Sequence, residues 1–168
     1  MGFSTASLYG LTWIIMSRTN HEALALEKFR EIARAKGMDS ESSQGARNRI
    51  PIAGAVYYQF GDLRVELPDK IIIIEVESSG GITNLAKYWE CFDSGRLTKP
   101  LKLLHIYRQV SVNDYRSHMV VWEFLCRKMQ ESMLGKFEGR LATYEAGNLD
   151  SLKPACEIFN GWLNEKAV

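Results

Sequence analysis

The stretch GDLRVELPDKIIIIEVE, residues 61–77, decides the fold that the sequence predicts. Its two halves are rich in aliphatic and β-branched residues and are separated by Pro68-Asp69-Lys70, a combination typical of a β-hairpin. The four isoleucines at 71–74 give the second strand apolar side chains on both faces, which indicates cover on both sides. We therefore expect this strand at the centre of a sheet.

The segments on either side alternate between helical and strand patterns. Thr19 and Glu22 form a capping-box pattern at the start of an amphipathic helix that ends at Gly37, and the aperiodic residues 38–51 predict a mobile loop. The other expected elements are strands at 55–60, 63–67 and 71–77, a helix ending at Gly95, a strand at 101–107, a helix at 112–133, a strand at 137–144 and a helix at 149–166. This order, αβββαβαβα, predicts one α/β (α+β) domain over residues 1–168, with a central mixed sheet of about five strands flanked by helices. Residues 1–15 are expected to be an N-terminal extension.

Composition limits the partners of the chain. Its 168 residues suffice for one hydrophobic core, and a formal net charge of +1 provides no overall field for nucleic acid, so any DNA contact needs a local basic patch. Cys91, Cys126 and Cys156 lack the spacing of a zinc site or a disulfide framework, which favours reduced thiols in a cytoplasmic protein. The apolar run at 8–16 is too short to span a bilayer, so we expect no membrane partner.

Acidic residues gather where the isoleucine strand ends. A period of two places Glu75 and Glu77 on one face, and pairing of Leu67 near Ile71 would bring Asp62 opposite about Val76. Two like charges at the end of an apolar strand need a compensating cation. The oxygens of Asp62 and Glu75, with the backbone carbonyl of Val76, form the ligand type that Mg²⁺ prefers. The alternative is a solvated edge, or ion pairs with Arg64 and Lys70.

With these residues in place, the sequence resembles the PD-(D/E)xK nuclease superfamily, whose core is a helix, a three-strand meander, a helix and a further strand. Gly61-Asp62-Leu63 looks like the strand that bears the first acid, and Glu75-Val76-Glu77 looks like the acid, spacer and third position of the motif. The resemblance covers residues 19–108 and implies a restriction-endonuclease-like fold. It further implies that Asp62 and Glu75 bind Mg²⁺, with Mn²⁺ as a substitute, and that an acid on the first helix, here Glu22, assists.

The third motif position departs from the family pattern, because it holds Glu77 where lysine is usual. A minority of restriction endonucleases in the superfamily carry glutamate there, as a metal ligand or a general base. In other branches the lysine has moved onto the following helix, where this chain has Lys87. Lys87 would then hold the scissile phosphate; the alternative is an ordinary surface lysine.

Candidate contacts to DNA lie on both sides of the acidic residues. The small residues after Glu77 would let backbone amides approach a phosphate at the start of the next helix, although a plain strand-to-helix loop or a helix cap explains them equally well. The candidates are Ser78, Ser79, Thr83 and Asn84 in that segment and Arg47 and Arg49 in the upstream loop. His105 lies in an apolar strand and is expected to be a core histidine with its hydrogen bonds satisfied, not an acid or base.

Two functions follow from this reading of the sequence. The first is a Mg²⁺-dependent deoxyribonuclease, an endonuclease of the restriction, repair or recombination type that acts on DNA; restriction enzymes usually cut as homodimers. The second is a catalytically inactive nuclease-like fold that serves as a nucleic-acid or protein-binding module, in which the missing lysine marks lost catalysis.

Overall fold

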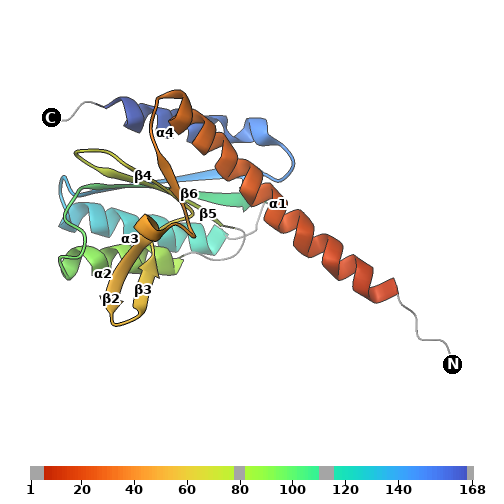
Figure 1. The fold of residues 1–168 in the computed structure, drawn as a ribbon, viewed down its shortest axis with the longest axis horizontal. Coiled ribbons are helices and arrows are strands. Elements are labelled where there is room, and N and C mark those ends of the chain that lie inside the picture. The colour runs from red at the N-terminus through yellow and green to blue at the C-terminus, as the bar shows by residue number, and fades with distance from the viewer. Residues whose placement is uncertain (1–5, 78–81, 110–115, 166–168) are drawn as a thin grey trace.

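The computed structural model describes residues 6–77, 82–109 and 116–165, and for residues 6–20 and 82 it describes only the backbone. Five strands form a sheet in the order β1-β4-β5-β6-β7 (Figure 1). They are β1 (Ser40–Ser42), β4 (Leu63–Glu66), β5 (Ile71–Glu77), β6 (Leu101–Gln109) and β7 (Phe137–Glu145). β1 and β5 pair antiparallel with β4, whereas β6 pairs parallel with both β5 and β7. The sheet is therefore mixed, and β5 occupies its middle, as the sequence predicts.

Helices cover both faces of this sheet. α1 (Ala6–Ala35) and α4 (Lys153–Asn164) lie on one face, and α2 (Ile82–Asp93) and α3 (Arg116–Ser132) on the other (Figure 1). Ile72, Ile74 and Val76 belong to the core under α1 and α4, while Ile71 and Ile73 belong to the core under α2 and α3. The alternation of β5 side chains between two separate cores explains why both of its faces are apolar. Glu75 and Glu77 consequently point to the α2 side.

The first strand of the expected meander is not part of the sheet. Residues 55–60 contribute β3 (Val56–Gln59), which pairs with β2 (Arg49–Ala53) as a separate two-stranded hairpin. The segment predicted as a loop, 38–51, contains β1, the 3₁₀ helix η1 (Ala46–Asn48) and the start of β2, and β1 takes the edge position beside β4. The sequence does not predict β1, because Ser-Glu-Ser has no apolar residue and hence no periodic pattern. Pro51 is tolerated in β2 because the hairpin has free edges.

Helix boundaries also differ from the prediction. α1 begins at Ala6, so the capping box at Thr19 lies inside a continuous helix, and residues 6–15 are helical. Neither proline nor a run of turn residues interrupts the segment before Thr19, and the backbone hydrogen bonds simply continue. The terminal helix starts with the 3₁₀ turn η2 (Leu149–Leu152) before α4. α3 lies within the predicted 112–133, whose first four residues fall outside the described part of the chain.

Cys91 and Cys126 are buried and Cys156 is partly buried, and all three are free thiols. Among the described residues, no helix is both long enough and apolar enough to cross a membrane.

Candidate active site

A pocket of about 380 Å³ opens where β5 ends. It is lined by residues from the end of the β2–β3 hairpin, the start of β4, the end of β5 and the first turns of α2, namely Gln59, Gly61, Asp62, Glu75, Glu77, Asn84 and Lys87. These lining residues include all four side chains that the sequence predicts to be catalytic. The fold therefore brings Asp62, Glu75, Glu77 and Lys87 together in one cavity.

Asp62 is fixed against the end of β5 by two backbone contacts. Its Oδ2 accepts the N–H of Val76 at 2.8 Å, and its own N–H donates to the carbonyl of Ile74 at 3.0 Å. Glu66 pairs with Ile71, whereas the sequence predicts that Leu67 does, so the register differs from the prediction by one residue. The cause is a tight turn in which the Leu67 N–H donates to the Lys70 carbonyl. The Asp62 carboxylate nevertheless reaches the level of Val76. The carbonyl of Val76 points toward the same side as its N–H.

Gly61 and Asn48 hold the chain in place just before Asp62. Gly61 has φ +87°, and a Cβ there would lie 2.4 Å from Cγ2 of Ile73, so only glycine fits. The fully buried Asn48 donates from Nδ2 to the carbonyl of Gly61 at 2.8 Å and to that of Ser42 at 3.0 Å. Sequence reasoning missed Asn48 because it lies in the aperiodic segment, where nothing distinguishes an anchoring amide from a loop residue.

Glu75 is 4% exposed and is held by two residues of α2. Its Oε1 accepts a hydrogen bond from Lys87 Nζ at 3.0 Å and another from the hydroxyl of Tyr88. Tyr88 is completely buried, and this burial together with the charge of Glu75 raises its pKa well above the usual value, so the phenol remains a donor. No sequence pattern indicates this role, since Tyr88 fits the apolar stripe of the helix.

Asn84 connects the remaining two polar groups. It donates from Nδ2 to Oε1 of Glu77 at 2.9 Å, and its Oδ1 accepts a hydrogen bond from Lys87 at 3.2 Å. Glu75, Lys87, Asn84 and Glu77 thus form one continuous chain of hydrogen bonds across the pocket. Thr83, the neighbouring candidate for a DNA contact, is exposed on the first turn of α2.

The pocket carries more negative than positive charge. Burial, followed by the charge of Glu75, raises the pKa of Asp62 to about 7. The pKa of Glu77 is also raised to about 7, by burial and then by the charges of Glu75 and Asp62. Glu22 on α1 contributes to both shifts, which puts its carboxylate within electrostatic range of the pocket. Among the described residues that line the cavity, Lys87 is the one cation facing three carboxylates.

The donor chemistry of this pocket fits a hard divalent cation. The described residues contain no group of three His, Cys, Asp or Glu side chains arranged to hold a metal. Mg²⁺, however, is commonly bound by one or two carboxylates with waters and substrate phosphates completing its shell. Asp62 and Glu75, with the Val76 carbonyl, provide oxygens of that type. Burial, and after it the charges of the neighbouring carboxylates, raises the pKa values of Asp62 and Glu77, so a cation would favour their charged forms.

The structure excludes one alternative for the two glutamates. Arg64 pairs with Glu66 at 2.8 Å, and Lys70 pairs with Glu165 at 3.4 Å, so neither cation serves Glu75 or Glu77. Of the other candidates, Arg47 and Arg49 do not line this pocket; they line a separate one beside β2. Ser78 and Ser79 fall outside the described residues.

His105 is buried in the core, as predicted. The prediction that its hydrogen bonds are satisfied is wrong. Its ring stacks on Tyr107 with centroids 4.7 Å apart, and burial lowers its pKa to about 3. Neither ring nitrogen has a hydrogen-bond partner in the described part of the chain. The histidine is expected to be neutral at physiological pH.

Comparison with known proteins gives no relative: no protein-family model, curated protein or solved structure matches the chain. The function must therefore be argued from the pocket itself.

Proposed function

We propose that this protein is a metal-dependent endonuclease that hydrolyses phosphodiester bonds in DNA. The observation that carries the proposal is the convergence of the carboxylate just before β4, the carboxylates of β5 and a lysine from α2 in one pocket. These are the residues that the PD-(D/E)xK pattern singles out, with the lysine supplied from the helix. Phosphodiester hydrolysis needs such a combination of metal-binding oxygens, a proton acceptor and a cation for the phosphate.

Each residue has a role that its surroundings suit. Asp62, Glu75 and the Val76 carbonyl would hold Mg²⁺ or Mn²⁺, and Glu22, within electrostatic range of Asp62 and Glu77, would assist. When bound, the metal would supply Lewis acidity and an activated water. Glu77 has a pKa of about 7, suitable for accepting a proton near neutral pH, and Asn84 orients its carboxylate. Lys87 lies between the two acids, where its ammonium would contact a phosphate oxygen.

Plasmid cleavage tests this proposal. We expect Asp62→Asn and Glu75→Gln to abolish Mg²⁺-dependent cleavage while leaving the circular dichroism spectrum unchanged, because each removes a charged oxygen ligand and keeps the side-chain shape. Glu123→Gln, an exposed acid on α3, is the matched control and should cut at the wild-type rate. Cleavage at the wild-type rate by both pocket variants would contradict the proposal.

One observation favours the inactive binding module as a second candidate. Glu75 already has two donors, Lys87 and Tyr88, and its charge is compensated without a metal. Isothermal titration with Mg²⁺ and Mn²⁺ separates the two functions. The nuclease requires a binding isotherm that Glu75→Gln removes, whereas the module requires none.

A further inference from the structure

The β2–β3 hairpin stands apart from the main sheet. Only Ile50 of its two strands is buried, while Val56 and Tyr57 near its tip are 60% and 45% exposed. Figure 1 shows the hairpin projecting beside α2, away from the strands of the sheet. A two-stranded hairpin is marginally stable by itself. This one is anchored at its base, where Phe60 is buried and donates its N–H to the carbonyl of Asn48 at 2.8 Å.

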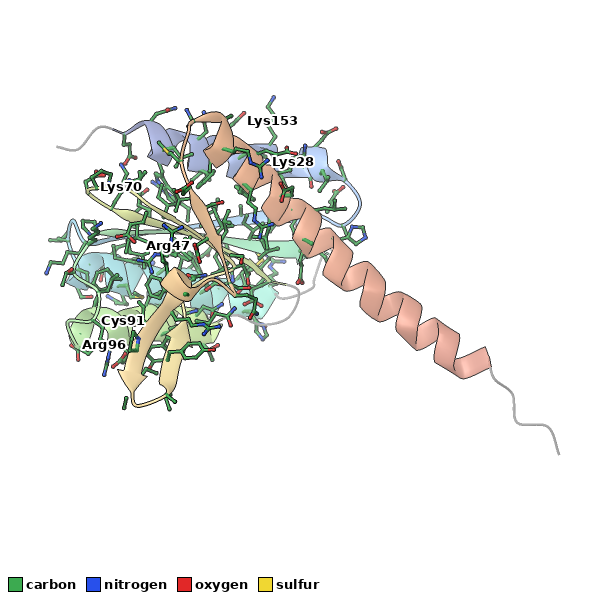
Figure 2. All side chains as sticks on the ribbon, viewed as in Figure 1. Lys28, Arg47, Lys70, Cys91, Arg96 and Lys153 are labelled. Carbon is green, nitrogen blue, oxygen red and sulfur yellow. The ribbon has the colours of Figure 1, made fainter. Side chains whose placement is uncertain are left out.

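A second pocket, of about 330 Å³, lies on the β2 side of this hairpin. Its charged lining consists of five cations and one acid, namely Arg47, Arg49, Arg64, Arg96, Lys99 and Glu66. Figure 2 shows Arg47 and Arg96 around the hairpin, well separated from Lys153 on the α4 layer. We call this cavity the basic pocket.

The basic pocket keeps surplus positive charge after its ion pairs are counted. Arg64 and Lys99 share Glu66, while Arg47 pairs with Glu41 and Arg96 pairs with Glu90. Three carboxylates thus face five cations. Arg49 has no carboxylate partner in the described part of the chain; its guanidinium lies 4.8 Å from the centre of the Tyr57 ring. The aromatic ring therefore orients an exposed cation that is available to an external anion.

The hairpin base separates the basic pocket from the acidic one. Arg49 lines the basic pocket, and its partner across the ladder, Gln59, lines the acidic pocket. Along β5, Ile71 borders the basic pocket and Glu75 and Glu77 border the other, a separation of about 13–20 Å at the usual rise of a strand. Phosphates on one DNA strand advance about 3.4 Å along the helix axis per nucleotide. The borders of the two pockets along β5 therefore lie about four to six base pairs apart, whereas at the hairpin base, where Arg49 pairs with Gln59, the pockets adjoin.

We propose that duplex DNA lies across the β2–β3 hairpin, with a backbone phosphate at Arg49 in the basic pocket and the scissile phosphate in the acidic pocket. This inference rests on the proposed function and identifies the surface that holds its substrate. The choice of duplex follows from shape as well as charge, because a two-stranded ribbon fits the major groove. Val56 and Tyr57 would then contact the groove while Arg49 neutralises the backbone.

Fluorescence anisotropy with a labelled 20-base-pair duplex in EDTA measures this binding without cleavage. We expect Arg49→Ala to weaken binding about tenfold and to lower the slope of log K against log salt by about 0.9, the loss of one phosphate contact. Val56→Glu should weaken binding by a similar factor, because it places a negative charge at the tip. Two matched controls should bind as the wild type does: Lys153→Ala, an exposed cation on α4, and Val120→Glu, a valine on α3 that is also 60% exposed.

The inference is overturned if both hairpin variants bind within twofold of the wild type, or if the wild type binds no duplex. It is also overturned if the single strand of the same sequence binds more tightly than the duplex, or if the controls lose as much affinity as the hairpin variants. Failure of the proposed function looks different: wild-type protein would not hydrolyse bis(p-nitrophenyl) phosphate with Mg²⁺. That diester is too small to reach the hairpin, so its result leaves the binding result in EDTA standing.

Discussion

Lys87 is the residue on which the charge balance of the acidic pocket depends. Its ammonium and the Glu75 carboxylate form an ion pair whose side chains are only 14% and 5% exposed. A pair so far from water receives little screening, and removing one partner leaves a buried charge without compensation. The same ammonium donates to Asn84 and so helps to place Glu77. A single cation therefore supports both acids of the Glu75-Val76-Glu77 motif.

Replacement of Lys87 should reveal this dependence. We expect Lys87→Met to lower the free energy of unfolding by about 3 kcal/mol at pH 8, because Glu75 keeps only Tyr88 as a donor. Adding Glu75→Gln to Lys87→Met should recover part of the loss, which urea denaturation and a double-mutant cycle would measure. Lys28→Met is the control, since the Lys28–Glu31 pair is about half exposed and should contribute less than about 1 kcal/mol. Equal losses in Lys87→Met and Lys28→Met would contradict this account.

At this scale the sequence identifies charged residues better than their supports. Glu75 and Glu77 could be selected because a strand has a period of two and because carboxylates at the end of an apolar strand need a compensating cation. Asp62 could be selected because the hairpin brings it level with the end of that strand. Tyr88 and Asn48 could not, since a tyrosine in an apolar stripe and an asparagine in a loop have ordinary explanations. Their functions depend on contacts between segments far apart in the chain.

Among the elements, the entry into β4 is the most tightly constrained part of the site. Gly61 combines a positive φ with close contact to Ile73, and the Asp62 carboxylate follows immediately. Any distortion here moves the first acid relative to β5. The backbone geometry of one turn therefore sets the spacing of the proposed metal ligands.

Two glycine substitutions separate backbone strain from crowding. Gly54, at the hairpin turn, has φ +55°, and no atom lies within 4 Å of the Cβ that alanine would add. Gly54→Ala should therefore lower the free energy of unfolding by about 1 kcal/mol, through backbone strain alone. Gly61→Ala meets φ +87° and the methyl of Ile73, so its cost should be about 2–4 kcal/mol. Guanidinium unfolding of both variants gives the comparison. A Gly61→Ala variant no less stable than Gly54→Ala would show that the β4 entry relaxes freely.

The elements that sequence patterning predicts are those with strong apolar signals. β5, β6 and β7 and the helices α2, α3 and α4 appear within a few residues of their expected positions, whereas α1 begins at Ala6, well before the expected start at Thr19. The short edge strand β1 is not predicted, because a three-residue polar strand carries no period. β3 lies at its expected position but pairs with β2 outside the main sheet, because a strand pattern does not state its partner. The same limit made the register of Asp62 wrong by one residue.

For the molecule as a whole, stability should respond to pH through two opposing sets of groups. Asp62 and Glu77 have pKa values of about 7 in the folded protein, whereas their reference values are 3.8 and 4.5. Between the reference pH values and about pH 7, the folded state therefore binds more protons than the unfolded state. Their contribution to stability therefore falls as pH rises from about 4 to 7. His105, with a pKa of about 3 against 6.5, acts in the other direction, since only the unfolded chain gains its proton as pH falls.

A comparison of Asp62→Asn with wild type isolates the acidic pocket, because the contribution of His105 is common to both proteins. In EDTA at pH 8.5 we expect the variant to be more stable than the wild type by about 2 kcal/mol. At pH 4 the two proteins should be about equally stable, because Asp62 is then protonated in the folded wild type. Mg²⁺ should raise the Tm of the wild type more at pH 8.5 than at pH 5, because metal and protons compete for the same oxygens, and should leave the Tm of the variant unchanged. Scanning calorimetry measures both effects, with the exposed Asp93→Asn as control. A variant less stable than wild type at pH 8.5 would mean that the Asp62 charge is already compensated, and the pocket would then have no electrostatic need for a cation.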